Sequence, residues 1–503
     1  MALLTERYSD KIRGVLSCFD RVILNGTIPE ICHKGAMALY LNTRKIRFFD
    51  YPRWAKPFRD EIRQNAEQLA RDHGLEIEFI RRHKEFRKEQ RIKEIIAQRG
   101  NHPGLVHIFS AMEHCPSFEA RYSKRKNRTI LRYTEAKCTH YYFYFIDEEL
   151  GLCYLRVPTW APFRLQFYFN AHNYLATQLA KRGINFQLLD NAFVQIDDFT
   201  TAQKLADALP VSKLHRRLNR FARLYCPAIR HFRSGYHWSI REVEYATDIV
   251  FHSRDDLHEL YQSLVRTVVH SVKAEHVSTF LGRKLTGNYQ GEIGNDLNTR
   301  VEGTRIRHQM GPAIIKMYDK FGRILRIETT SNNVSFFKHH SKVEHRDGSW
   351  EMKFAPMKKS IYSLPALRVL MGSANQRYLQ FISTADDPTS GIRNLDKISH
   401  SISDGQRKYR GFNLFDGDDL ALFHALLRGE FNISGFTNRR LRPFLGKTGR
   451  QVSLILKRLR VHGLIKKVRG TYKYHLTRLG RRVVLTALHM RQMITPAFVF
   501  RPS

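Results

Sequence analysis

Residues 448–476 read TGRQVSLILKRLRVHGLIKKVRGTYKYHL, and this stretch carries the clearest fold signal in the chain. Apolar side chains recur at helical spacing as far as Gly463, a residue type that commonly ends helices. Two apolar runs, 464–468 and 472–476, then flank an Arg-Gly pair, which predicts a β-hairpin with a basic tip. The sequence therefore predicts a helix followed directly by a hairpin.

Further helices surround this pair of elements. Asp418 and Asp419 are expected to cap a helix over 420–427, because an aspartate side chain accepts hydrogen bonds from the free amides of a helix start. The other predicted elements are a helix over 437–445 that starts at Thr437, a turn over 446–449, the helix over 450–462, and a last helix from Thr477.

This order of three helices, a basic hairpin and a further helix is that of a winged helix-turn-helix. Residues 416–495 also resemble MarR-type winged-helix domains, through the progression Gly-Leu-Ile, Arg-Gly-Thr and Tyr-x-Leu-Thr-x-x-Gly-Arg. The resemblance implies DNA binding, with the helix 450–462 as the recognition helix in the major groove. Winged helices also serve as protein–protein modules, and that alternative stays open.

Charge favours nucleic acid as the partner. From Phe431 to Ser503 the chain has seventeen Lys or Arg and no Asp or Glu, and the whole chain has a net charge of +37. Such a surface gains affinity for phosphates by counterion release. Base contacts are expected from one helix face and phosphate contacts from the hairpin. The helix residues are Arg450, Ser453, Lys457 and Arg460, and the hairpin residues are Lys466, Lys467 and Arg469.

Length and composition limit the remaining possibilities. A chain of 503 residues with 42% apolar residues is expected to form two to four folded domains. No apolar run is long enough to cross a membrane, no signal-peptide pattern starts the chain, and the six cysteines form no Cys-x-x-Cys pair. We therefore expect a cytoplasmic α+β multidomain protein. It would comprise an N-terminal α/β region (1–120), a central α+β region (121–400) and the winged helix (416–495).

Patterns in the body predict mixed strands and helices. Residues 11–28 are expected to form two short strands around Asp20, and 163–182 an amphipathic helix. A hairpin is expected over 140–157, where the aromatic run 141–145 is either core or a surface that stacks single-stranded bases. A three-stranded meander is predicted over 304–331. The basic run 121–132 is expected to be a loop that contacts phosphates, through Lys124, Arg125 and Lys126.

Tyr318 is the first candidate for a catalytic residue. Strand alternation would place it on one face with Lys316 and Lys320, next to Glu328 on the neighbouring strand. Two lysines would favour the phenolate and bind the scissile phosphate, and Glu328 would hold a divalent cation such as Mg²⁺. The segments Tyr-Asp-Lys and Arg-x-Glu resemble those of rolling-circle replication initiators. This resemblance implies a tyrosine strand transferase, although no His-x-His metal pair is present. Ordinary cross-strand ion pairing is the alternative.

Carboxylates on or beside predicted strands form a second candidate site. Asp20 is the most unusual, because it interrupts an apolar strand pattern in a basic protein. An Asp on a strand together with two later acids is what a two-metal nuclease or transposase requires. The later acids considered for this role are Asp147 with Glu148, Asp190, and Asp197 with Asp198; turn formation and helix capping are their alternative roles.

These patterns together predict a DNA-binding protein of a bacterial mobile element, because the whole chain is similar to mobile-element proteins that end in a MarR-like domain. It would read DNA with the winged helix and cleave strands as a transposase or replication initiator. Two alternatives remain. One is a MarR-like transcriptional regulator without catalysis, whose body senses a ligand or dimerises. Because one winged helix buries modest surface, specificity requires a dimer or help from the N-terminal region. The other is a protein that binds structured RNA.

Overall fold

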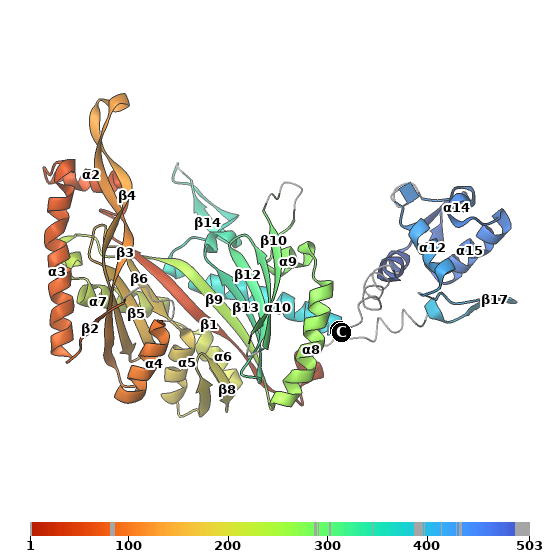
Figure 1. The fold of residues 1–503 in the computed structure, drawn as a ribbon, viewed down its shortest axis with the longest axis horizontal. Coiled ribbons are helices and arrows are strands. Elements are labelled where there is room, and N and C mark those ends of the chain that lie inside the picture. Colours follow the sequence, from red (N-terminus) through yellow and green to blue (C-terminus); the bar gives the residue numbers. More distant parts are fainter. Residues whose placement is uncertain are drawn as a thin grey trace, which may run out of the picture. The chain divides into compact units, whose positions relative to one another are not determined.

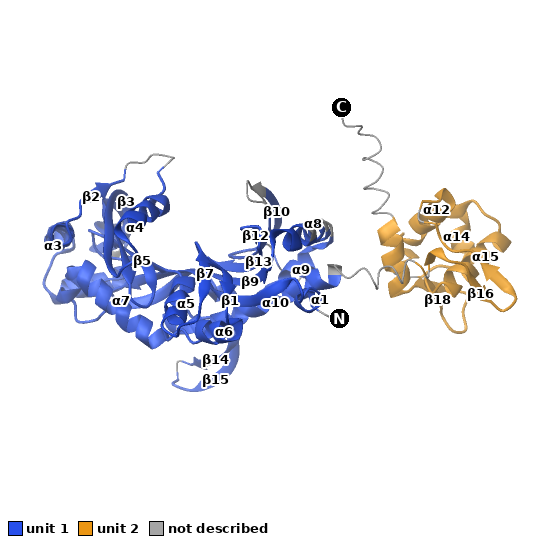
Figure 2. Ribbon diagram, turned by 90° about the horizontal axis from the view of Figure 1, so that it is seen from below, with its two compact units in different colours: residues 1–386 blue, residues 387–503 orange. Residues whose placement is uncertain are grey.

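The computed structural model describes residues 3–487, apart from 81–85, 286–288, 290, 301–302, 346, 387–395, 397, 414, 429 and 432–434. The chain divides into two compact units, 1–386 and 387–503 (Figure 2). None of the helices in the described part of the chain has the length and hydropathy to span a bilayer.

Unit 1 combines helices with one large mixed sheet (Figure 1). All neighbouring strands are antiparallel except the pair at one edge, β2 and β3. From one edge to the other, the strands are β10 (Ile293–Arg300), β11 (Gly303–Met310), β12 (Ala313–Lys320), β13 (Ile324–Ser331), β9 (His237–Phe251), β1 (Ile12–Thr27), β6 (Leu165–Phe169), β5 (Gly151–Pro158), β4 (Arg128–Asp147), β3 (Gly104–Ser123) and β2 (Ile77–Phe79).

Helices and two small hairpins complete unit 1. The helices are α1 (Leu4–Arg7), α2 (Lys34–Thr43), α3 (Tyr51–Asp72), α4 (Lys88–Arg99), α5 (Ala171–Ala180), α6 (Phe199–Asp207), α7 (Val211–Tyr225), α8 (Arg254–Ser271), α9 (Ala274–Phe280) and α10 (Leu364–Asp386). The hairpins are β7 (Phe186–Leu189) with β8 (Ala192–Ile196), and β14 (Lys338–Glu344) with β15 (Trp350–Pro356).

The two faces of the sheet differ in chemistry. On β4 the odd-numbered Phe143 and Phe145 pack against Tyr225 of α7, while the even-numbered Tyr142 and Tyr144 belong to a smaller cluster with Ile92 of α4. Farther along the sheet, the amide of Asn375 on α10 contacts Thr247 and Thr329, which alternate with Asp248 and Glu328. The helices α7 and α10 therefore cover one face, and the charged residues lie on the other.

Several predicted elements differ from the structure because tertiary pairing outweighs local signals. Residues 12–27 form one long strand, since β9 pairs with β1 along its length and β6 pairs with its second half, through the Asn-Gly pair. The region predicted as one helix, 163–182, contains β6 and then α5, which Asn170 caps. Residues 121–132 are the end of the β3–β4 hairpin rather than a loop. The meander over 304–331 is confirmed.

The expected boundary near residue 120 is not a boundary between compact units. Strand β1, from the N-terminal region, lies between β6 and β9 of the central region. Residues 1–386 therefore share one sheet and one main core.

Unit 2 contains α12 (Gly417–Leu426), α14 (Asn438–Leu445), α15 (Gly449–Val461), the hairpin of β18 (Ile465–Lys467) and β19 (Tyr474–Leu476), and a helix over 478–487. A second hairpin, β16 (Ile402–Asp404) with β17 (Arg407–Tyr409), precedes them. The predicted cap of the first helix was wrong: Asp416 caps α12, whereas Asp419 is buried and accepts hydrogen bonds from Arg458 at 2.7 and 2.8 Å. Thr437 caps α14 as predicted, and Thr448 caps α15.

Candidate functional site

A bulge in the central strand creates the starting point of the site. Phe19 pairs with Tyr245 and Arg21 with Glu244, so Asp20 is an extra residue on β1 without a partner on β9. A bulge of this kind redirects a side chain and is common beside active sites. Here it places the Asp20 carboxylate among charged groups from β9 and β13, only 5% exposed.

Arg326 on β13 joins two buried aspartates. Its guanidinium donates to both carboxylate oxygens of Asp248, at 2.6 and 2.7 Å, and to Asp20 at 3.0 Å. None of these three side chains is more than 6% exposed. Removing the Arg326 guanidinium from this group would destabilise the fold, because it would leave buried carboxylates without their paired charge.

Amide and imidazole groups complete the surroundings of Asp20. Asn191, from the β7–β8 turn, donates to both Asp20 oxygens at 2.6 and 2.7 Å, and Asn170 donates at 3.2 Å. His172 Nδ1 lies 3.3 Å from the same carboxylate. Burial alone would raise the pKa of Asp20, but Arg326, His172 and Lys320 together hold it well below its usual value. Asp20 is therefore ionised and held in a fixed position.

Glu328 links this network to Tyr318. The Tyr318 hydroxyl donates to Glu328 at 2.8 Å, and the Lys316 ammonium lies 2.6 Å from the other oxygen of Glu328. Lys316 also lies 3.5 Å from Glu244 on β9. The strand register explains these contacts, because Lys316 is directly opposite Glu328 and Tyr318 opposite Arg326. The predicted common face of Lys316, Tyr318 and Lys320 is present.

The prediction that Lys316 and Lys320 favour the ionised form of Tyr318 is wrong. Burial, and then the negative charge of Glu328, raise the pKa of the Tyr318 phenol well above its usual value. Lys316 is neutralised by Glu328 and Glu244, and Lys320 donates to the Asn191 side chain instead of pointing to the phenol. The resting group is therefore a phenol, and a nearby base must accept its proton before it can attack as a nucleophile.

Three carboxylates could hold a cation at this position. One oxygen each from Asp20, Glu244 and Glu328 lie within 4.8 Å of one another. Oxygen ligands suit Mg²⁺. Burial, and then repulsion by Glu328, raise the pKa of Glu244 to about 7, and the positive charge of Lys316 offsets this rise only in part. Asp20 and Glu328 were predicted as metal ligands from the sequence, whereas Glu244 was not.

The raised pKa of Glu244 makes stability depend on pH. The folded protein holds a proton on Glu244 that the unfolded chain loses above its usual pKa of 4.5, so stability falls as pH rises toward about 7. Glu244→Gln should remove this fall. Relative to wild type, we expect the variant to gain about 1–3 kcal/mol of unfolding free energy between about pH 5 and about pH 8, measured by urea denaturation. Glu242→Gln, on the same strand face, is the matched control, and an equal gain there would contradict the assignment.

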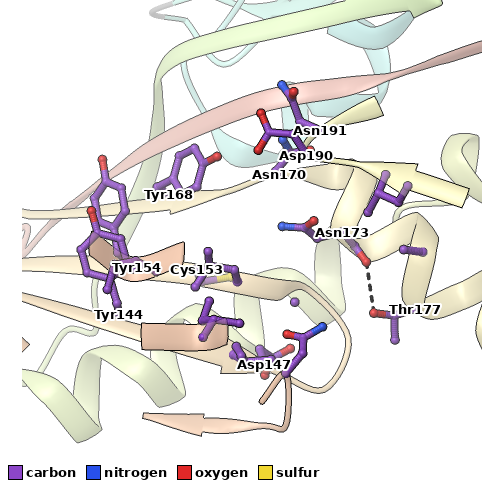
Figure 3. Close-up of a pocket in the computed structure, with 18 of the residues that line it drawn as sticks. Tyr144, Asp147, Cys153, Tyr154, Tyr168, Asn170, Asn173, Thr177, Asp190 and Asn191 are labelled. Atoms are coloured by element: carbon purple, nitrogen blue, oxygen red, sulfur yellow. Dashed lines mark hydrogen bonds between the residues drawn. The ribbon is translucent and has the colours of Figure 1, made fainter. Parts of the chain in front are cut away.

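A cavity of about 850 Å³ opens beside the carboxylates. Asp20 and Glu244 lie on its wall. Figure 3 shows three tyrosines of the same wall, Tyr144, Tyr154 and Tyr168, which come from three adjacent strands. The rings of Tyr154 and Tyr168 are stacked, with centroids 5.1 Å apart. The cavity thus joins a stacked aromatic wall to the charged site.

The other carboxylates predicted from the sequence do not belong to the group formed by Asp20, Glu244 and Glu328. Asp147 and Asp190 line the same cavity but are ion-paired elsewhere, Asp147 with Arg217 at 2.8 Å and Asp190 with Lys93 at 2.8 Å. Asp198 caps α6 and Asp197 accepts from Asn185, so both are structural. Glu148 lines the cavity as well. Within the described residues, His339, His340 and His345 belong to no potential metal-binding group, and the aromatic run 141–145 is buried on both faces.

Sequence reasoning missed Glu244, Asp248, His172 and Asn191. A signal was present for the first two, because Glu244 and Asp248 alternate with the apolar or small residues Ala246 and Val250 on one face of the strand. Asp20 had been noticed for the same reason. His172 and Asn191 gave no such signal, since both lie next to helix or turn boundaries and reach the site only through the fold.

In unit 2, most of the residues predicted to contact DNA are exposed. These are Arg450, Ser453, Arg460, Lys466, Lys467 and Arg469. Two of the predicted base contacts have partners within the protein: the Ser453 hydroxyl accepts from Asn438 at 2.7 Å, and Lys457 is ion-paired with Asp404 of the β16–β17 hairpin. A contact between Lys457 and a base therefore requires this ion pair to open.

Searches of protein-family models, of curated proteins and of solved structures found no match to this chain.

Proposed function

We propose that unit 1 is a DNA strand-cleaving and strand-joining domain that uses Tyr318 as nucleophile with Mg²⁺ as cofactor. The observation that carries the proposal is the hydrogen bond, 2.8 Å long, from the Tyr318 hydroxyl to Glu328, one of the three converging carboxylates. A phenol, a base within reach and a candidate cation site are the components that phosphodiester transfer needs.

In the proposed step, the Tyr318 oxygen attacks the phosphorus of a phosphodiester. Its proton passes to Glu328, which already accepts its hydrogen bond. The bond from phosphorus to the leaving sugar oxygen breaks, and that oxygen takes a proton from water. The product is a phosphotyrosine ester, which a strand hydroxyl can attack in turn, so the step supports joining as well as cutting. A bound divalent cation would neutralise the phosphate charge.

The cavity supports a single strand as the substrate. Tyr154 and Tyr168 offer stacked aromatic rings next to the carboxylates, and stacking accepts any base. Bases can reach such a wall only when they are unpaired. We therefore expect single-stranded or locally melted DNA to be cleaved faster than intact duplex.

We propose further that unit 2 is a winged helix that reads the DNA of a mobile element. Its exposed α15 face and the basic tip between β18 and β19 support this, with no acidic residue from Phe431 onward. The variant Lys466→Gln/Lys467→Gln/Arg469→Gln should weaken duplex binding and reduce the slope of log K against log salt by roughly 0.9 per lost phosphate contact. Binding would be measured by fluorescence anisotropy at several salt concentrations.

The control variant for this prediction removes the same number of positive charges from unit 1 instead of unit 2. Arg53, Lys56 and Lys181 are exposed on unit 1, and their triple glutamine variant should bind nearly as wild type. Equal weakening by both triple variants would mean that charge alone, and not the hairpin, drives binding.

Incubation with labelled single strands tests the proposed activity. With Mg²⁺ the wild type should give a slow-migrating covalent adduct on a denaturing gel, and with EDTA it should give none. Intact DNA in every lane, together with salt-sensitive binding on a native gel, would favour the alternative of a regulator without catalysis.

A further inference from the structure

The β3–β4 hairpin continues beyond the sheet as a two-stranded ribbon. Strand β2 pairs with β3 only over 108–110, and β5 pairs with β4 only from His140 onward. Among the described residues, the pairs from Met112–Thr139 to Ser123–Arg128 therefore have no neighbouring strand on either side. Figure 1 shows this ribbon extending past α2. We call residues 112–139 the arm.

The inner part of the arm is anchored to the body on both faces. Ser117, on the opposite face from Phe118, is buried, and its hydroxyl lies 3.2 Å from that of Tyr51. Phe118 and Leu131 are buried, and Phe118 contacts the ring of Tyr51 at the start of α3, with centroids 6.0 Å apart. Tyr133 lies on the same face and its hydroxyl accepts from the Lys34 amide of α2 at 3.3 Å. These contacts fix the direction of the arm, while Tyr122, Lys124, Arg125 and Asn127 near its tip stay exposed.

The opposite face is basic. The register places Ser123 opposite Arg128, Arg121 opposite Ile130, and Glu119 opposite Arg132, so all three arginines share one face by strand alternation. All three are exposed, and Glu119, directly opposite Arg132, is the acid that lies beside them on this face. Lys124 and Arg125 extend the charge around the tip; the side chain of Lys126 lies outside the described residues. Residues 120–134 contain no acid.

We propose that the arm inserts into the major groove of duplex DNA, with Arg121, Arg128 and Arg132 on phosphates at the groove walls. Paired strands lie about 4.8 Å apart, so a ribbon with its side chains fits a B-form groove about 12 Å wide. The major groove of A-form RNA is too narrow for such an element. The inference rests on the proposed function only in taking DNA as the ligand, and it assigns unit 1 a duplex-gripping element separate from the Tyr318 site.

The test uses the full-length chain, a labelled random-sequence DNA duplex and the variant Arg121→Gln/Arg128→Gln/Arg132→Gln. We expect affinity to fall by about tenfold or more, and the salt slope to fall by roughly 0.9 for each of the three contacts. The Arg53→Gln/Lys56→Gln/Lys181→Gln variant is the charge-matched control. Equal losses in the two variants, or no loss in the arm variant, would overturn the proposal.

Two further measurements distinguish insertion of the arm into the DNA major groove from nonspecific electrostatic attraction between the protein and DNA. Dimethyl sulfate methylates guanine N7 in the major groove. The wild type should protect some of these positions that stay reactive with the arm variant, and both proteins should protect the remaining positions equally. Binding to an RNA duplex of the same length should not respond to the arm substitutions. Unchanged N7 protection, or equal loss of RNA binding, would contradict the assignment to the DNA major groove.

Cleavage of short single strands distinguishes this proposal from the proposed activity. The arm variant should cleave them at the wild-type rate, because the arm lies outside the Tyr318 site. If the wild-type protein binds duplex DNA through the arm but does not cleave DNA, the proposal for the arm is supported and the proposed cleavage activity is contradicted.

Discussion

Tyr318→Phe is expected to lower the rate of DNA strand cleavage by a factor on the order of 10³ or more and to remove the covalent adduct completely. The substitution deletes only the hydroxyl that donates to Glu328 and keeps the ring. Among the described residues, no other donor contacts the same oxygen of Glu328, so the variant has no replacement for this hydroxyl. Single-turnover cleavage of a labelled single strand measures the effect.

Tyr362→Phe is the matched control. Tyr362 is an exposed residue of unit 1 whose hydroxyl also makes one side-chain hydrogen bond, with His215 at 2.8 Å. This variant should cleave as wild type. Cleavage by Tyr318→Phe at the wild-type rate would exclude Tyr318 as the nucleophile, whatever the control shows.

Arg326→Met is expected to destabilise unit 1 by about 3–5 kcal/mol, because it removes the guanidinium that pairs with both buried carboxylates, Asp20 and Asp248. Methionine keeps much of the volume of the side chain, so the effect comes from charge rather than from a cavity. Since this amount is a large share of the stability of a typical domain, we expect the melting temperature of the variant to fall toward room temperature. Thermal denaturation followed by circular dichroism measures the loss.

Arg323→Met controls for the loss of a positive charge nearby. Arg323 is exposed in the turn before β13, and its replacement should change stability by less than about 0.5 kcal/mol. The double variant Arg326→Met/Asp248→Leu should recover part of the stability lost by Arg326→Met, since it removes one of the two carboxylates that lose their partner in the single variant. Equal stability of Arg326→Met and wild type would contradict the account of a buried ion network.

Local patterns predicted the elements whose pairing is local. The meander over 304–331 and the hairpin over 140–157 join strands that follow each other in sequence, so turn residues and alternation were sufficient. The same alternation placed Tyr318 and Glu328 side by side on adjacent strands. Elements set by distant pairing were mispredicted. Residues 12–27 form one strand because β9, more than 200 residues later, pairs with it.

The candidate site also combines features that local sequence patterns predicted with features that depend on distant strand pairing. Asp20 was recognised as unusual because it interrupts an apolar strand, but the sequence could not show that a bulge places it beside Arg326. The buried pairing of Arg326 with Asp248 depends on the contact between β13 and β9, which no local signal specifies. The expected activation of the phenol by lysines failed because Glu244 and Glu328, whose positions follow from the same pairing, neutralise Lys316.

The most direct measurement is to map the covalent attachment. Full-length protein would be incubated with a single strand and Mg²⁺, digested with a protease and a nuclease, and analysed by tandem mass spectrometry. The account predicts a nucleotide linked to Tyr318 and to no other tyrosine. Cleaved DNA without any nucleotide-linked peptide, or a linkage at a different residue, would contradict it.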